Sequence, residues 1–189
     1  MKKLIILLLV FSPNSYFSQE KNMRISNSAL ERSTNQVTYD GSYVRLDYPN
    51  GDVSPDKGVC TDVVIRTYRN ALGVDLQKLI HEDMVSNFDK YPKRWHLSKP
   101  DKNIDHRRTQ NQECFLTRQG AKIAITDNPN DYLPGDLVYY GDIASGHVGI
   151  VVHKKHNGEP MIVHNIGGGP KLENFLFASR ITGHYRYIP

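Results

Sequence analysis

The apolar residues of this chain change their spacing near its middle, and this change limits the possible folds more than any other feature. In residues 59–72 the apolar side chains recur at helical spacing, and Gly73 is placed to end that helix. Asp75 can cap a second helix, which must stop before Pro92. A short third helix is expected at residues 109–118. The first half of the chain is therefore predicted to be helical.

The second half has the apolar runs and the two-residue alternation of β-strands. Strands are expected at residues 137–140, 147–153, 160–165 and 183–188. The dipeptide Asn157-Gly158 is a strong hairpin signal between the second and third of these strands. Helices followed by antiparallel strands indicate an α+β fold. Residues 37–189 are long enough for one well-cored domain, and we expect a single domain there.

The N-terminus carries Lys2 and Lys3 and then eight apolar residues, 4–11. A helix needs about 20 apolar residues to cross a bilayer, so this run is too short. The pattern is typical of a secretory signal peptide, residues 1–18, cut after Ser18. Residues 19–36 are polar and are expected to be a leader or a loosely attached helix. We therefore predict an exported protein, periplasmic or secreted, with no transmembrane anchor.

The charge balance argues against a nucleic-acid partner. The formal net charge is +4, and it falls to +2 without the two lysines of the predicted signal. That excess is too small to attract a polyanion, and the basic residues form no continuous stripe. We expect a monomer that binds neither nucleic acid nor a cofactor.

One cysteine and two histidines are placed as a nucleophile and its base would be. Cys60 follows the break at Gly58 and opens the first predicted helix, where unpaired amides and a partial positive charge favour a thiolate. His147 follows Gly146 at the start of a strand, so it could exchange a proton with the thiol. His164 ends the returning strand beside it and could fix the tautomer of His147. This order of a cysteine and two histidines along the chain predicts covalent acyl transfer without a metal.

Gly149, two residues after His147, affects how closely the helix that carries Cys60 could approach the sheet. Alternation places His147 and Gly149 on the same face of the sheet. We expect the missing side chain to leave room there for the helix that carries Cys60.

These residues resemble the NlpC-type papain-like cysteine peptidases of bacterial cell walls. That superfamily has a cysteine at a helix start, a Gly-Asp-Leu-Val strand, a His-Val-Gly-Ile strand and a polar residue on the strand after. The corresponding positions are Cys60, residues 135–138, residues 147–150 and His164. More closely, the chain resembles the exported bacterial family called domain of unknown function 1287. The matching segments are residues 58–64, 103–108, 164–167 and 183–187.

The resemblance implies a papain-like fold, with N-terminal helices packed on a central antiparallel sheet. It also implies hydrolysis of amide bonds in peptidoglycan stem peptides, with peptidoglycan or its fragments as partner. Members of the superfamily have a cleft tyrosine about a dozen residues before the cysteine, and Tyr48 takes that place here. The chain departs from the common Asp-Cys-Ser-Gly pattern, since Val59 precedes the cysteine and Thr61 follows it.

Four further residues complete the expected substrate-binding set. Arg107 and Arg108 could hold a stem-peptide carboxylate between them, although a structural salt bridge fits them equally well. Asp62 could face the substrate, or it could be a first-turn carboxylate favoured by the helix dipole. Asn165, directly after His164, is the last of the set.

Other functions stay open at this point. In an exported protein Cys60 and Cys114 could pair as a disulfide, and the chain would then be a non-catalytic wall-binding module. A zinc-dependent wall peptidase could use the histidines, but the chain has no His-Glu-x-x-His pair. A related acyltransferase would pass the same thioester to an amine instead of water.

Overall fold

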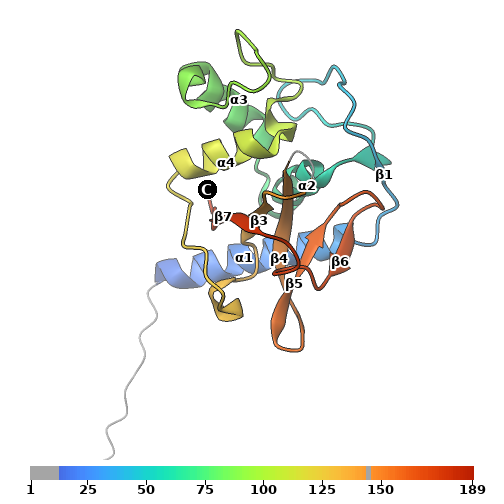
Figure 1. Cartoon of the computed structure of the whole chain (residues 1–189), viewed down its shortest axis with the longest axis vertical. Coiled ribbons are helices and arrows are strands. Elements are labelled where there is room, and N and C mark those ends of the chain that lie inside the picture. Colours follow the sequence, from blue (N-terminus) through green and yellow to red (C-terminus); the bar gives the residue numbers. More distant parts are fainter. Residues whose placement is uncertain (1–12, 144–145) are drawn as a thin grey trace, which may run out of the picture.

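The computed structural model describes residues 13–143 and 146–189. The α-helices in these ranges are α1 Pro13–Arg32, α2 Cys60–Leu72, α3 Leu76–Ser86 and α4 Thr109–Arg118 (Figure 1). Single 3-10 turns lie at Phe88–Lys90, Asp105–Arg107 and Pro129–Asp131. The helices predicted at residues 59–72 and 109–118 are confirmed to within one residue.

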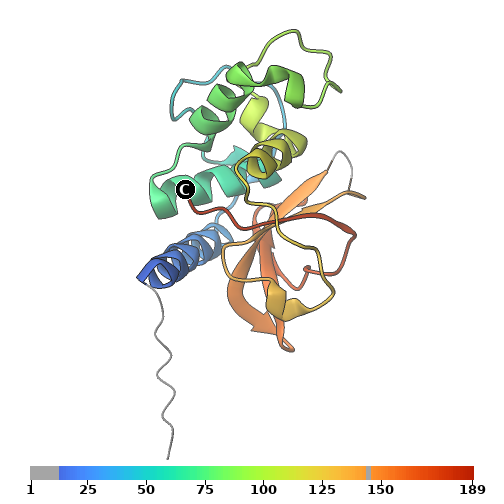
Figure 2. The same cartoon turned by 90° about the vertical axis from the view of Figure 1, so that its left-hand side faces the viewer.

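One antiparallel sheet has its strands in the order β6-β5-β4-β3-β7. The bounds of its strands are β3 Leu137–Tyr140, β4 His147–His156, β5 Glu159–His164, β6 Lys171–Glu173 and β7 Ile181–Tyr185. A separate parallel pair joins β1 Thr38–Tyr39 to β2 Lys57–Gly58. Figure 2 shows the α-helices gathered to one side of the sheet. The α+β class is thus confirmed.

The two faces of β4 belong to two different cores. Val148, Ile150 and Val152 share the larger core with Cys60 and the apolar face of α2. Val151, which points the other way because strand side chains alternate, belongs to a smaller core on the opposite face of the sheet. This division decides on which face of the sheet each candidate site residue lies.

Local capping signals set the ends of α2 and α3 as predicted. Gly73 adopts the left-handed conformation at φ 68°, and its N–H donates to the carbonyls of Arg69 and Tyr68. The Asp75 carboxylate accepts from the amide of Gln77 at 3.0 Å and begins α3.

The segment expected to be a leader or a loosely attached helix is a helix that packs firmly on the domain. Residues 19–32 belong to α1, which packs against α2 and β4, and its Ile25 and Ala29 are fully buried. Its other buried positions are polar: Asn22, Ser26 and Ser28. Ser26 accepts from the His153 amide at 2.9 Å and bonds its ring Nδ1 at 2.9 Å. An apolar pattern could not reveal this contact face, because much of the face is polar and satisfied by hydrogen bonds.

The structure describes only part of the segment predicted to be a signal peptide. Residues 1–12 lie outside the described ranges, and the predicted cut after Ser18 falls inside α1. Among the described helices, none combines the length and apolarity needed to cross a membrane.

Candidate active site

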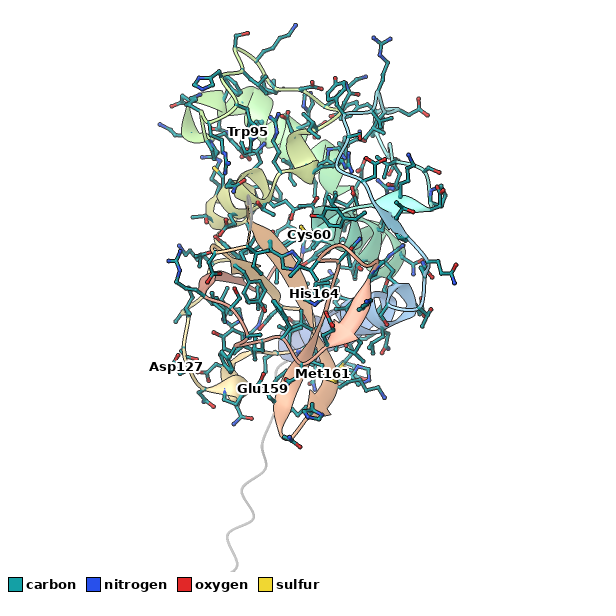
Figure 3. All side chains as sticks on the ribbon, turned by 45° about the vertical axis from the view of Figure 1, so that its right-hand side comes forward. Cys60, Trp95, Asp127, Glu159, Met161 and His164 are labelled. Carbon is teal, nitrogen blue, oxygen red and sulfur yellow. The ribbon has the colours of Figure 1, made fainter. Side chains whose placement is uncertain are left out.

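Cys60 is the first residue of α2, and the chain holds this helix start from two sides. The Asp62 carboxylate accepts from the amide of Val59 at 2.7 Å, which ties the first turn back to the residue before it. On the sheet side, Cys60 lies in the same core as Val148, the residue after His147. The thiol is therefore next to the start of β4. In the view of Figure 3, Cys60 lies between Trp95 above and His164 below.

Burial dominates the electrostatics of the thiol. It raises the pKa of Cys60 to about 11, and the Asp62 carboxylate adds to the rise. The amides of Val148, Thr61 and Cys60 itself favour the anion and offset part of this effect. The thiolate expected from the helix N-terminus is therefore not the resting form, because desolvation outweighs the helix end.

The conformation before His147 depends on glycine. Gly146 has φ 106°, a left-handed conformation that side chains rarely adopt. A Cβ there would also lie 2.6 Å from the hydroxyl of Thr109, the first residue of α4. The start of α4 therefore abuts the residue before β4, and the first residues of α2 and α4 line one cleft together with Gly146.

A hydrogen-bonded chain runs from His147 across three strands. Nε2 of His147 lies 2.8 Å from Nδ1 of His164, and Nε2 of His164 lies 2.8 Å from Oε2 of Glu173. The two histidines are at most 2 % exposed, whereas the Glu173 side chain is 43 % exposed. Phe175 covers the His164 ring at a centroid distance of 4.4 Å. The chain thus connects a buried imidazole to a carboxylate at the surface.

These contacts fix the tautomers of both rings. Burial lowers the pKa of His147 to about 3, with His164 adding to the shift, and burial also lowers the pKa of His164. Both rings are then neutral at pH 7, with one N–H each. The Glu173 carboxylate can only accept, so His164 donates from Nε2 and accepts at Nδ1 from His147. Nδ1 of His147 is left with a lone pair, as a base requires.

The expected role of Gly149 is corrected by the structure. A Cβ at Gly149 would lie 2.3 Å from Cγ2 of Ile162 and 3.4 Å from Cβ of His164, both on β5. The glycine makes room for β5 and not for α2. Helix α2 instead packs against the other face of β4, on residues such as Val148.

Asp62 and Arg107 form a buried ion pair with each other. Nε and Nη2 of Arg107 donate to the two carboxylate oxygens of Asp62 at 2.9 Å each. The remaining Arg107 donors bond the carbonyls of Ser42 and Asp40, and the two side chains are 2 % and 4 % exposed. Of the two roles considered for Asp62 and for Arg107, these contacts favour the structural one, because the pair fixes the first turn of α2.

Asn165 is also a structural link. Its Nδ2 donates to the carbonyl of Gly58 at 3.2 Å, its Oδ1 accepts from Gly167, and it is fully buried. The residue therefore ties the end of β5, next to His164, to the loop before Cys60, and it does not face solvent as a substrate-binding group would.

Tyr48 does not line the cleft that contains Cys60. Its ring lies 5.3 Å from that of His81, on a different surface. The cleft beside Cys60 has a volume of about 450 Å³, and the tyrosines on its wall are Tyr39 and Tyr43. Arg108, in contrast, lines this cleft.

The structure bears on two of the other functions considered above. Cys60 and Cys114 are both free thiols, so the predicted alternative of a disulfide between them is wrong. In residues 13–143 and 146–189, no three His, Cys, Asp or Glu side chains are grouped as metal ligands. The zinc alternative therefore gains no support from the described part of the chain.

Comparison with known proteins agrees with the sequence resemblance at the level of a family. The model of the family described as domain of unknown function (DUF1287) matches residues 26–187. The chain belongs to the DUF1287 family. Among curated proteins, the uncharacterized protein YijF of Escherichia coli (strain K12) is 45 % identical over 169 residues, which is 88 % of this chain and 82 % of YijF.

Two features of the site in this DUF1287 protein escaped sequence reasoning. Glu173 lies on β6, a three-residue strand with no apolar alternation to reveal it. The resemblance places the cleft tyrosine about a dozen residues before Cys60, which points to Tyr48, whereas Tyr39 and Tyr43 line the cleft. One signal could have indicated Glu173. The glycine-rich turn after β5 can reverse the chain, so an acidic residue soon after that turn can lie beside β5.

Proposed function

We propose that this protein is an exported cysteine hydrolase of the NlpC-type papain-like class, which cleaves amide bonds of peptidoglycan stem peptides. The observation that supports it most is the hydrogen-bonded chain of His147, His164 and Glu173, which leaves one ring nitrogen of His147 with a free lone pair at the start of β4. Cys60 lies beside the next residue of that strand, at the N-terminus of a helix. The substrate class comes from the sequence resemblance.

In the acylation step, Nδ1 of His147 takes the proton of the Cys60 thiol while the sulfur attacks the amide carbonyl. Because the resting thiol is neutral, proton transfer and attack occur together. The main-chain amides of the first turn of α2, which already face the sulfur, stabilise the oxyanion that forms. The imidazolium of His147 then gives its proton to the leaving amine, and the carbon–nitrogen bond breaks to leave a thioester.

Deacylation repeats these proton movements with water. Nδ1 of His147 takes a proton from the water as its oxygen attacks the thioester, and the carbon–sulfur bond breaks. The proton returns to Cys60, and the carboxylic acid product leaves. His164 stabilises the transient imidazolium in both steps by accepting from its Nε2, and Glu173 in turn orients His164.

The test is hydrolysis of defined muropeptides by the mature protein, with products identified by mass. Cys60→Ala should abolish product formation, whereas Cys114→Ala, which removes the other free thiol, should leave it intact. Circular dichroism and the urea midpoint of Cys60→Ala check that its fold is retained. Activity that persists in a folded Cys60→Ala protein would overturn the proposal.

A further inference from the structure

The cleft beside Cys60 is lined by one sign of charge. Its described lining includes Arg94, Arg107 and Arg108 and no Asp or Glu side chain. Arg107 is neutralised by its bidentate pair with Asp62. Arg94 and Arg108 therefore give the cleft its positive character, and the first turn of α4, which opens on the same cleft at Thr109, adds the partial charge of a helix N-terminus.

Arg108 is held by stacking more than by hydrogen bonds. Its guanidinium carbon lies 4.2 Å from the ring centroid of Trp95, and that of Arg94 lies 5.5 Å from the same ring. Nη1 of Arg108 is buried without a hydrogen-bond partner. A guanidinium fixed on an aromatic face is pre-organised and presents a planar edge that fits a carboxylate.

The carboxylates that act on Arg108 are those of Asp105 and Asp101, and neither lines the cleft. Oδ1 of Asp105 is 4.0 Å from Nη1, too far for a hydrogen bond, and the Asp105 side chain has no exposed surface. Its other oxygen, Oδ2, accepts from the Asp101 amide at 2.6 Å and contacts His81 at 3.3 Å. Asp105 therefore holds Arg108 in place electrostatically and leaves its cleft side available.

We propose that Arg108, stacked on Trp95, is a subsite for a substrate carboxylate next to the scissile amide. The proposal rests on the proposed function, since it places the amide at Cys60 and the anion farther along the same cleft. It specifies the substrate class: peptides that carry a free carboxylate on a residue flanking the bond that is cut. The amidated form of the same peptide would leave the guanidinium unpaired and bind poorly.

Trp95 provides a direct readout, because it is the only tryptophan of the chain. The Cys60→Ala protein is titrated with two peptides that differ only in whether that flanking carboxylate is free or amidated. The free acid should change the Trp95 fluorescence and bind at least tenfold more tightly than the amide. Arg108→Met should bring the two affinities together, whereas Arg45→Gln, outside this cleft, should keep the difference.

The outcome separates the subsite from the proposed chemistry. Tighter binding of the free acid than of the amide, measured by Trp95 fluorescence, supports the subsite. If the wild-type protein then hydrolyses neither peptide, only the hydrolase proposal fails. Equal affinity for the acid and the amide, or discrimination that persists in a folded Arg108→Met protein, overturns the subsite whatever the hydrolysis assay gives.

Discussion

Nε2 of His147 donates to Nδ1 of His164 across 2.8 Å, and this single contact decides which nitrogen of His147 can act as a base. The direction of the bond follows from Glu173, which accepts from the far side of His164 at 2.8 Å. A surface carboxylate thereby sets the tautomer of a buried ring two hydrogen bonds away. Nδ1 of His147 is the only ring nitrogen of the pair left for a thiol.

Replacing Glu173 should disturb this arrangement without removing any group that touches the substrate. In Glu173→Gln the amide can also donate to His164, so both rings can take the opposite tautomer and Nδ1 of His147 would then carry the proton. We expect kcat to fall by about 10- to 100-fold with little change in KM. Nitrogen-15 NMR of the ring nitrogens should show the change of tautomer directly.

The matched control for this prediction is Glu159→Gln at the start of β5, far along the strand from His164. It should leave both kcat and the NMR signals of the two rings unchanged. A Glu173→Gln protein with the wild-type tautomers and an unchanged kcat would show that Glu173 plays no part in orienting His164.

The local features of this fold could be predicted from the sequence, and the site could be predicted in part. Gly73 and Asp75 act within one turn of their own position, so their roles as helix ends followed from residue type alone. The hydrogen bond between His147 and His164 also followed, because a hairpin brings its two strands together.

What could not be predicted depends on contacts distant in sequence. Nothing near Asp62 indicates that Arg107, 45 residues later, will take both of its oxygens. The burial that keeps Cys60 protonated comes from the packing of α2 against β4, which the helix alone does not reveal. The packing of α1 on the domain could not be predicted for a related reason, since Ser26 is buried by a bond to His153.

The raised pKa of Cys60 predicts how its alkylation depends on pH. Iodoacetamide reacts with the thiolate, and with a pKa of about 11 the thiolate is on the order of one part in ten thousand at pH 7. Deprotonation increases as pH rises, so the rate constant should climb about tenfold per pH unit from pH 7 to 10. The measurement uses Cys114→Ala, in which Cys60 is the only thiol. A rate constant that is flat between pH 5 and 8 would mean a resting thiolate–imidazolium pair instead.

Breaking the buried Asp62–Arg107 pair should cost much stability. In Arg107→Met the Asp62 carboxylate stays buried without its counter-charge, and we expect the free energy of unfolding to fall by about 3–5 kcal/mol. The Lys78–Glu82 pair, whose side chains are 49 % and 54 % exposed, is the matched control, and Lys78→Ala should cost no more than about 0.5 kcal/mol. Urea unfolding measures both. A loss below about 1 kcal/mol in Arg107→Met would show that the pair does not hold the first turn of α2.

Adding a single methyl group at Gly149 should disturb the positions of His147 and His164. The Cβ of Gly149→Ala would meet Cγ2 of Ile162 at 2.3 Å, so β5 must shift and carry His164 with it. We expect the free energy of unfolding to fall by about 1–3 kcal/mol and kcat to fall with it. In the control Gly41→Ala, the new Cβ finds its nearest neighbour at 3.6 Å, and the free energy of unfolding should hardly change.

The steric cause of this loss can be isolated with a double-mutant cycle. Ile162→Ala removes the clashing methyl group but leaves a cavity, at a cost of about 2–5 kcal/mol on its own. In the double variant the new methyl at Gly149 partly fills that cavity, so the two substitutions together should cost at least about 1 kcal/mol less than their sum. Costs that simply add would mean that the methyl of Ile162 is not what excludes a side chain at Gly149, and that β5 can move away without strain.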